Sequence, residues 1–533
     1  MDSALEGVPF ATGASLLVEC LYRHGVRHIF GMPGSHSTCI YDAIGRHRGI
    51  ETTLCRNEQA GAFMADGYAR ATGRPGVLCT TAGPGATNAL TGIAEAYSDS
   101  VPLLLIAGQV NHDRIHEECG RYHEMDLESI FRPCTRFAAT VMRNEDIPAT
   151  LDGAFNEMLA GRPGPAAIFL PQDLMAAPAE AGAKASAASL RRIMPGDDAI
   201  RRAIGLLSQA SRPVILAGGG VISSGAEAEL EELARKLDCP IVTTLNGKGA
   251  VDERSPYSLG HGRTRRARMV LGRADMMLAV GCRFTEVFTA SGTMPIPKTL
   301  IQIDIQPHPI GRNYPVALGL AGDARSVLAA TLAGIPQRQG EWKQTWQRAR
   351  DAKQLKPEWI VDVLREQIPE SSIVFADACE MGLRMHTDFP AYAPRTFFYP
   401  SNYATLGWGL PAAIGGAVGQ PERWTICVCG DGGFMMAAQE LSTAVRYRLK
   451  LIVVIHNDST YGAIKAIQRR NHESRFVDTD LNNPDFAKFA DSFGVPSYRV
   501  EAPQGFAVAL RQALHADGPS LIEIPDTWRS LRI

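Results

Sequence analysis

The sequence lacks the patterns that mark nucleic-acid-binding proteins, membrane proteins and secreted proteins. Its charge is almost balanced, with 54 Lys and Arg residues against 56 Asp and Glu residues and a net charge of −2, so we expect no nucleic-acid partner. No segment approaches about 18 uninterrupted apolar residues, and no basic region precedes the first apolar ones, so we expect no membrane partner and no secretory signal. The 11 cysteines form no CxxC pair, which favours reduced thiols and a cytoplasmic location.

Short apolar runs instead alternate with helical patterns along 533 residues, a length with room for about three domains. This alternation predicts an α/β fold of three doubly wound parallel-sheet domains. Two linker-like stretches, near 175–192 and 335–357, divide the chain into predicted domains 1–175, 190–335 and 357–533. The predicted strands are PGVLCTT, VPLLLIAG, AAIFLP, RPVILAGG, MMLAVG, TLIQIDI, SIVFADA, WTICVCG and LKLIVVIHND.

The first and third predicted domains have a similar layout. Residues 77–108 and residues 426–458 both read as strand, glycine turn, helix and strand, at similar spacing. A duplicated unit would give this pattern, and so would two ordinary βαβ units.

A single carboxylate, Asp431, stands among Gly430, Gly432 and Gly433 where a predicted buried strand ends. Asp458 follows the next strand 27 positions later (458 − 431), about one βαβ crossover, so both carboxylates are expected at one sheet edge. Buried carboxylates need a cation, and hard oxygen ligands suit Mg²⁺ with phosphate oxygens completing its shell. The glycines allow backbone N–H groups to approach a diphosphate. A plain turn, with Asp431 as a helix N-cap, is the alternative.

GDG followed by ND-x-x-YG, with a strand and a helix between, resembles the thiamine diphosphate (ThDP) binding motif of acetolactate synthases and benzoylformate decarboxylases. The resemblance covers essentially the whole chain. It implies pyrimidine-binding, central and diphosphate-binding domains in that order. Many family members have Asn where Asp458 stands, so this residue adds negative charge. The implied ligands of Mg²⁺ are Asp431, Asp458 and the Thr460 carbonyl, and the implied cofactor contacts are Gly430, Gly432, Gly433, Tyr461, Gly462 and Ala463.

The catalytic carboxylate is expected at Glu58, which begins an apolar helix in RNEQAGAFMADGYARATG. The resemblance implies that Glu58 hydrogen-bonds N1′ of the aminopyrimidine and drives acid–base catalysis through the cofactor. Similarly, NYATLGWGLPAAIG resembles the segment beneath the cofactor. It places Leu406 as an apolar support and the Ala404 carbonyl as acceptor for the 4′-amino group. A helix-terminal charge and ordinary core packing are the alternatives for Glu58 and Leu406.

Glu58 and Asp431 fall in different predicted domains. The resemblance implies that each active site forms between the first domain of one subunit and the third domain of another. A homodimer is then the minimum assembly, and a tetramer, as a dimer of dimers, is common in such families.

Three positions bear on the reaction with a 2-oxo acid substrate. Ser35 in GMPGSHST stands where benzoylformate decarboxylase has Ser and acetolactate synthases have Gly or Ala; it can bind a carboxylate, although a turn serine is equally consistent. His123 stands where acetolactate synthases carry Gln and is a candidate proton donor or acceptor, as are His36 and His116. Ile467 stands where acetolactate synthases carry Trp.

Other segments favour the acetolactate synthase branch, among them TAGPGATN and IDIQPHPIGRNYPV. Some relatives bind FAD in the central domain, where Gly218–Gly220, Arg283 and Asp304 could support a nucleotide. Because a glycine run also serves tight strand-to-helix packing, we favour a structural central domain over an FAD site.

These patterns predict a cytoplasmic, Mg²⁺- and ThDP-dependent enzyme that decarboxylates a 2-oxo acid and transfers the acyl carbanion equivalent to a second carbonyl. The alternative is a decarboxylase that releases an aldehyde, which Ser35 and Ile467 favour. A catalytically silent ThDP-fold subunit is a further alternative, although it need not retain the acidic residues above. A nicotinamide-dependent dehydrogenase is set aside, because the first βαβ unit lacks GxGxxG.

Overall fold

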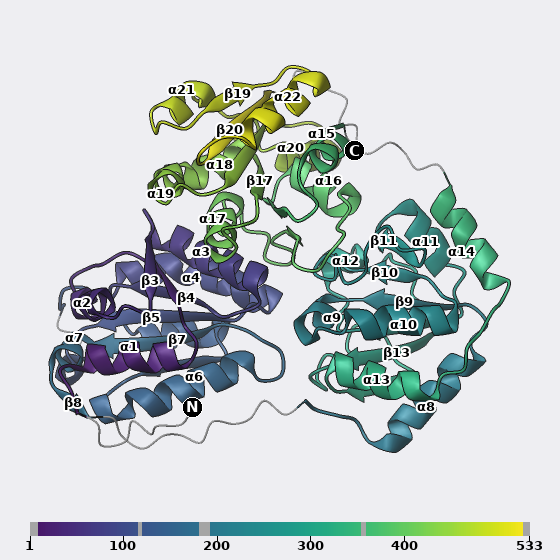
Figure 1. Ribbon diagram of the computed structural model, residues 1–533, viewed down its shortest axis with the longest axis horizontal. Coiled ribbons are helices and arrows are strands. Elements are labelled where there is room, and N and C mark those ends of the chain that lie inside the picture. Colours follow the sequence, from purple (N-terminus) through teal and green to yellow (C-terminus); the bar gives the residue numbers. More distant parts are fainter. Residues whose placement is uncertain (1–8, 116–119, 181–191, 353–358, 526–533) are drawn as a thin grey trace.

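The computed structural model describes residues 9–115, 120–180, 192–352 and 359–525, and every structural statement below concerns those residues. Three α/β domains organise this part of the chain, each around one six-stranded sheet with flanking helices (Figure 1). All strand pairs inside these sheets are parallel. The predicted fold class is therefore confirmed. No described helix is long and apolar enough to cross a membrane.

The N-terminal domain has the sheet order β3-β2-β4-β5-β7-β6. In sheet order the strands are β3 (Glu51–Leu54), β2 (His28–Gly31), β4 (Gly76–Thr80), β5 (Leu103–Gln109), β7 (Ala166–Pro171) and β6 (Phe137–Thr140). The helices are α1 (Gly13–Arg23), α2 (Thr38–Arg46), α3 (Glu58–Thr72), α4 (Pro84–Asp99), α5 (Leu127–Phe131), α6 (Ile147–Leu159) and α7 (Gln172–Ala176). A small antiparallel pair, β1 (Pro9–Phe10) and β8 (Ala179–Glu180), completes the domain.

The C-terminal domain has the sheet order β16-β15-β17-β18-β20-β19. Counted within each domain, this order equals that of the N-terminal domain, which favours the duplicated unit. The strands are β16 (Phe397–Phe398), β15 (Ile373–Ala376), β17 (Thr425–Gly430), β18 (Leu451–Asn457), β20 (Ser520–Pro525) and β19 (Ser497–Arg499). The helices are α15 (Trp359–Gln367), α16 (Glu380–Asp388), α17 (Gly409–Gly419), α18 (Asp431–Ala437), α19 (Leu441–Arg446), α20 (Gly462–Asn471), α21 (Phe486–Asp491) and α22 (Pro503–Ala513).

The central domain has the sheet order β11-β10-β9-β12-β13-β14, the order of dinucleotide-binding sheets. Its topological switch point, where such sheets bind ligands, lies between β9 and β12. The strands are β11 (Ser258–His261), β10 (Ile241–Thr243), β9 (Pro213–Ala217), β12 (Met276–Val280), β13 (Thr299–Asp304) and β14 (Leu318–Ala321). The helices are α8 (Asp197–Gln209), α9 (Gly219–Ser224), α10 (Glu227–Leu237), α11 (Arg265–Leu271), α12 (Glu286–Thr289) and α13 (Ala324–Gly334).

All nine predicted strands are present, as β4, β5, β7, β9, β12, β13, β15, β17 and β18. The second linker-like stretch differs from its prediction, because it contains helix α14 (Trp342–Asp351). Trp342 and Trp346 lie four positions apart, on one helical face, and both are buried in the central domain. That face makes an otherwise polar segment pack as a helix.

Helix α3 of the N-terminal domain lies directly against α17 of the C-terminal domain. Small residues allow this approach, since a Cβ at Gly67 would collide with the Ala412 carbonyl oxygen and one at Gly415 with the Met64 carbonyl oxygen. One hydrophobic cluster therefore spans both domains and includes Phe63 as well as Ala412.

Candidate active site

Two carboxylates stand where neighbouring strands of the C-terminal sheet end. Asp431 follows β17 and Asp458 follows β18, and these strands are parallel neighbours with Gly430 opposite His456. Burial raises the pKa of Asp431 to about 6; a hydrogen bond from Asn483 opposes this shift and the charge of Asp458 adds to it. A cation between the carboxylates would relieve this repulsion.

The carboxylate oxygens of this pair accept hydrogen bonds from neighbouring N–H groups. Asp458 Oδ1 accepts the N–H of Thr460 at 3.0 Å. The Asn483 amide donates to Asp431 Oδ2 at 2.6 Å and to Asn457 Oδ1 at 3.0 Å. The two carboxylates themselves are hard oxygen ligands of the kind that fits Mg²⁺. Sequence reasoning missed Asn483, which lies 52 positions beyond Asp431 and belongs to no motif.

The glycines of the motif are required by close packing. A Cβ at Gly432 would lie 2.6 Å from the Tyr461 ring, and one at Gly462 would lie 2.5 Å from Asp458 Oδ2 and 3.2 Å from Glu380 Oε2. A side chain at Gly432 would displace the Tyr461 ring, and one at Gly462 would displace the Asp458 carboxylate.

A third carboxylate, Asp377, follows β15, the other neighbour of β17. It is 1% exposed and accepts the N–H groups of Ala378 at 2.9 Å and Gly407 at 3.0 Å. Burial raises its pKa to about 6. Asp377 thereby ties the segment before α17 to the sheet edge. The sequence holds a signal for it, a carboxylate directly after the apolar run SIVFA.

The predicted cofactor support lies in the loop 401–408 before α17. Leu406 is half-buried and lies outside the hydrophobic clusters, so ordinary core packing does not account for it. Ala404 has φ 56, in the left-handed region. The N–H of Thr405 donates to Glu95 of α4.

Glu58 is the first residue of α3, after the N-cap Asn57, whose side chain accepts the Gln59 N–H. Only 8% of Glu58 is exposed, so it is not a solvated charge at a helix end. Its Oε2 accepts from Asn88 Nδ2 at 3.0 Å, and its Oε1 would lie 3.1 Å from a Cβ at Gly85.

Within one chain, Glu58 and Asp431 stand near opposite ends of α18 and the short helix after it. The loop before Glu58 contacts the far end, where Arg56 N donates to Glu440 Oε1 at 2.9 Å. Glu440 lies nine positions after Asp431 (440 − 431), a span of roughly 14 Å at helical rise. No hydrogen bond joins Glu58 to Asp431 or Asp458 in the described part of the chain.

Ser35, His36 and His123 come together beside the turn 81–85 that also touches Glu58. Ser35 Oγ lies 3.2 Å from His36 Nδ1, and the rings of His36 and His123 have centroids 5.3 Å apart. Burial, and next the charge of His123, lowers the pKa of His36. His123 Nδ1 is buried and has no hydrogen-bond partner among the described residues. His116 lies outside the described residues.

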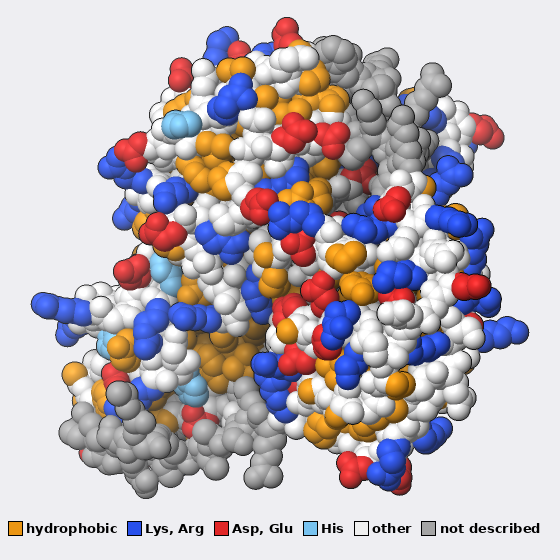
Figure 2. Space-filling view, turned by 45° about the vertical axis from the view of Figure 1, so that its right-hand side comes forward, with side chains coloured by type: hydrophobic (Ala, Val, Ile, Leu, Met, Phe, Trp, Pro, Cys, Tyr) orange, Lys and Arg blue, Asp and Glu red, His pale blue; other side chains and the backbone are white. Residues whose placement is uncertain are grey.

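A cavity of about 630 Å³ lies where the three domains meet. Figure 2 shows a hollow between the N-terminal and central domains, with hydrophobic side chains at its base and Lys or Arg on its rim. The cavity reaches the switch point, where a Cβ at Gly218 would collide with the Gly281 carbonyl oxygen. Close packing against Gly281 therefore explains why Gly218, the first residue of the run Gly218–Gly220, is a glycine.

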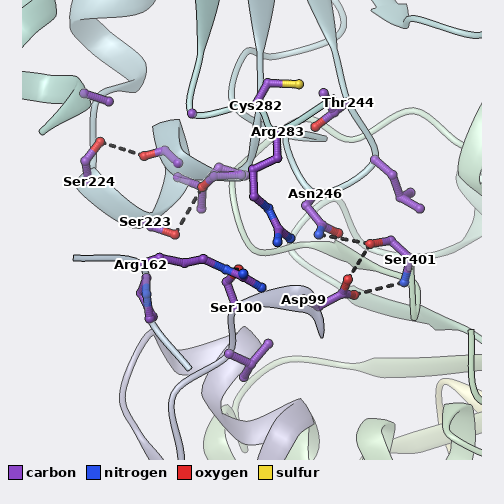
Figure 3. A pocket seen from close by; sticks show the side chains of 18 of the residues that line it. Asp99, Ser100, Arg162, Ser223, Ser224, Thr244, Asn246, Cys282, Arg283 and Ser401 are labelled. Carbon is purple, nitrogen blue, oxygen red and sulfur yellow. Dashed lines mark hydrogen bonds between the residues drawn. The ribbon is translucent and has the colours of Figure 1, made fainter. Parts of the chain in front are cut away.

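Two guanidinium groups, of Arg162 and Arg283, extend toward one another in this cavity (Figure 3). Arg162 donates to Ser100 Oγ at 2.7 Å, and Arg283 donates to the Ser98 carbonyl at 2.9 Å. Burial, and next the charge of Arg283, lowers the pKa of Arg162 to about 10. Two cations held together in this way favour an anionic ligand. Asp304, 7% exposed, ends the neighbouring strand β13.

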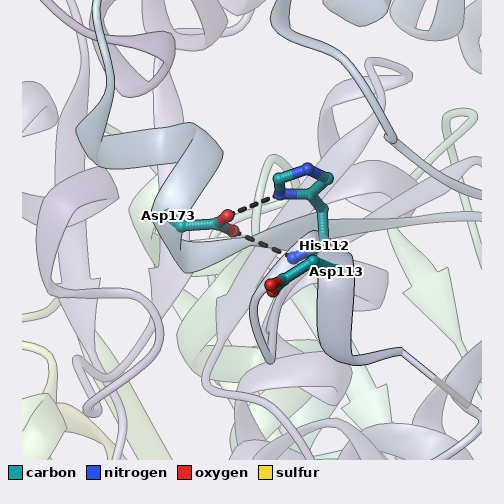
Figure 4. Close-up of side chains that lie close together, drawn as sticks. All are labelled: His112, Asp113 and Asp173. Carbon is teal, nitrogen blue, oxygen red and sulfur yellow. Dashed lines mark hydrogen bonds and ion pairs between the residues drawn. The ribbon is translucent and has the colours of Figure 1, made fainter. Parts of the chain in front are cut away.

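A separate group of potential metal ligands, His112, Asp113 and Asp173, lies in the N-terminal domain (Figure 4). Its groups already have partners, because His112 Nδ1 lies 2.5 Å from Asp173 Oδ2 and Asp113 pairs with Arg114 at 3.3 Å. Two of the three are exposed. We assign no metal to this group.

The chain matches three family descriptions. Residues 11–130 match "Thiamine pyrophosphate enzyme, N-terminal TPP binding domain", residues 200–331 match its central domain, and residues 377–524 match its C-terminal TPP binding domain. The chain belongs to the thiamine pyrophosphate (ThDP) enzyme family. The matched ranges fall in the three α/β domains of the structure.

Similar proteins of this family are named as acetolactate synthases or their large subunits. The chain is 35% identical to the acetolactate synthase isozyme 3 large subunit of Escherichia coli, over 94% of this chain and 92% of that protein. It is 34% identical to the acetolactate synthase large subunit of Haemophilus influenzae, over 94% and 92%. It is also 34% identical to the acetolactate synthase of Arthrospira platensis, over 98% and 96%.

Proposed function

We propose that this ThDP enzyme decarboxylates a 2-oxo acid and transfers the acyl carbanion equivalent to a second carbonyl, as an acetolactate synthase-like carboligase. The observation that carries the proposal is the carboxylate pair Asp431 and Asp458 at adjacent strand ends, in a chain similar to acetolactate synthases over more than nine-tenths of its length. The free cysteines among the described residues support the expected cytoplasmic location.

Asp431, Asp458 and the Thr460 carbonyl would hold Mg²⁺. Bound ThDP supplies the electron sink that carbon–carbon bond cleavage next to a carbonyl requires. Backbone N–H groups of the chain would donate to the diphosphate. The proposed cofactor contacts are Gly430, Gly432, Gly433, Tyr461, Gly462 and Ala463.

In this proposal Glu58 would hold the proton that acid–base catalysis through the aminopyrimidine needs, and its buried site would keep competing water away. Leu406 would support the bound cofactor, and the Ala404 carbonyl would accept from its 4′-amino group. Ser35 and His123 face the 2-oxo acid. Ser35 binds the substrate carboxylate, and His123 carries a proton at its unpartnered Nδ1.

The active site is proposed to form between two copies of the chain, because α18 and the short helix after it separate Glu58 from Asp431 within one chain. Two of the relatives are named as large subunits, which supports an oligomeric assembly. The test mixes inactive Glu58→Gln and Asp431→Ala proteins under subunit exchange. Hybrid dimers then contain one intact site, and equal mixing should restore about a quarter of wild-type activity. No recovery despite proven exchange would contradict a shared site. Light scattering decides between a dimer and a dimer of dimers.

Proton NMR of the protein with ThDP, Mg²⁺ and pyruvate, and then with longer and aromatic 2-oxo acids, tests the reaction. A hydroxyketone product such as acetolactate supports the carboligase. No turnover of any acid despite measured ThDP binding would favour a silent subunit.

A decarboxylase that releases an aldehyde is the second candidate. The cluster of Ser35, His36 and His123 favours it, because imidazoles close to the substrate can deliver the proton that completes an aldehyde. Ile467 on α20 is 41% exposed where acetolactate synthases carry Trp. An aldehyde as the sole product would decide for this candidate.

The central cavity supports a nucleotide ligand more strongly than the sequence alone does, and FAD is the first to test. Arg162 and Arg283 would face its phosphates, and Asp304 at the end of β13 would face a ribose hydroxyl. Flavin absorbance of the purified protein, and flavin fluorescence released on denaturation, test this assignment. A nucleotide without flavin would appear in the same extract by mass spectrometry.

A further inference from the structure

A buried polar cluster joins α3 and α4 to the loop 401–408. Its members are Asp66, Arg70, Glu95 and Asp99, whose side chains are at most 7% exposed. The Arg70 guanidinium lies 2.7 Å from Asp66, 3.2 Å from Asp99 and 3.8 Å from Glu95. One cation thus faces three carboxylates, whose remaining oxygens require other donors.

The loop supplies donors to each carboxylate, although Asp66 Oδ1 and Glu95 Oε1 accept no hydrogen bond from the described residues. At its start, Asp99 accepts the N–H of Ser401 at 2.9 Å and the hydroxyl at 2.6 Å (Figure 3). At its end, Asp66 Oδ2 accepts from Trp408 Nε1 at 2.8 Å. The N-terminal domain therefore fixes both ends of the segment.

Glu95 holds the middle of the loop. Its Oε2 accepts the N–H of Thr405 at 3.2 Å and the hydroxyl at 2.7 Å. In a planar trans peptide, the N–H of one residue points opposite to the carbonyl of the residue before it. The bond to Glu95 therefore turns the Ala404 carbonyl away from the buried cluster. Ala404 is in the left-handed region, which is unfavourable for a residue with a Cβ, so its conformation needs such an external bond.

We propose that Glu95 is a positioning residue of the cofactor site. It acts through the Ala404–Thr405 peptide and does not touch ThDP. The inference rests on the proposed function, in which the Ala404 carbonyl accepts from the 4′-amino group. The carboxylate of Glu95, in the N-terminal domain, thus fixes through Thr405 the direction of the Ala404 carbonyl, in the C-terminal domain.

The test compares three variants by calorimetry of ThDP at saturating Mg²⁺. Glu95→Asp keeps a carboxyl group beside Arg70 but withdraws the acceptor from Thr405, so we expect about tenfold weaker ThDP binding. Glu95→Gln keeps an acceptor at full length, and Thr405→Val keeps the N–H while removing the hydroxyl. Both are expected to bind ThDP within about threefold of wild type. At saturating ThDP, Glu95→Asp should lower kcat and leave the KM of the 2-oxo acid unchanged.

Thermal melting without ThDP shows that each variant is folded, because a structural defect alone would lower the Tm and leave ThDP affinity in the folded fraction unchanged. Glu95→Asp with wild-type affinity would overturn the inference alone. Glu95→Gln as weak as Glu95→Asp would show that an acceptor at full length is not sufficient, and Thr405→Val as weak would assign the effect to the hydroxyl; both contradict the peptide argument. Wild-type protein that binds no ThDP would overturn the proposed function and this inference with it.

Discussion

Replacement of Glu58 by Gln separates its chemistry from its packing. Gln has the same length, and its Oε1 can still accept from Asn88 Nδ2, which lies 3.0 Å from Glu58 Oε2. The free energy of unfolding should therefore change by less than about 1 kcal/mol. Turnover should fall by about 10²–10⁴, the usual contribution of a positioned acid–base group, because an amide cannot exchange the proton. That fall raises the activation barrier by about 3–5 kcal/mol.

The assay follows CO₂ release at saturating ThDP and 2-oxo acid, with ThDP affinity from calorimetry and the Tm from melting. Glu440→Gln is the matched control, because Glu440 is also buried and accepts the Arg56 N–H at 2.9 Å on the same interface. It should turn over close to the wild-type rate. Full turnover by Glu58→Gln would refute the role of Glu58. An equal loss in Glu440→Gln would assign the effect to the interface between the domains.

Three further predictions follow from single contacts. Asp431→Ala should abolish Mg²⁺-dependent ThDP binding, and unchanged affinity by calorimetry would remove the metal assignment. Burial raises the pKa of Glu95 from 4.5 to about 8, so the stability that its proton provides is lost as pH rises through this interval. Between pH about 5 and about 9, the wild-type Tm should therefore fall more steeply than that of Glu95→Gln, and equal slopes would contradict this. Gly67→Ala should destabilise the protein by about 1–3 kcal/mol through its collision with Ala412, whereas Gly45→Ala, with nothing within 4 Å, should not; equal Tm values would refute the packing argument.

The sequence predicts the sheets wherever a strand is buried on both faces. Long apolar runs such as that of β18 are unambiguous, because both sides of the strand must be apolar. Short strands such as β16, with two residues, carry no such signal. Helix α14 does carry a local signal, because Trp342 and Trp346 have helical spacing. The polar residues around them nevertheless favour a linker.

The candidate site divides in the same way. Asp431 and Asp458 follow from strand ends at crossover spacing, a local pattern. Asn483 and Glu95 depend on contacts between segments that are far apart in sequence and on the order of strands, so no local pattern reports them. His36 lies one position from Ser35, and only its contact with His123 in the fold distinguishes it from other histidines.

The two sides of the contact between α3 and α17 are synthesised at different times. Asp66 and Trp408 are 342 residues apart in the chain, and at roughly 5–20 residues per second a ribosome needs about 17–70 s to make that stretch. For this time the nascent N-terminal domain carries a charged cluster and a glycine face without the helix and loop that cover them. An N-terminal fragment produced alone would keep this surface exposed permanently.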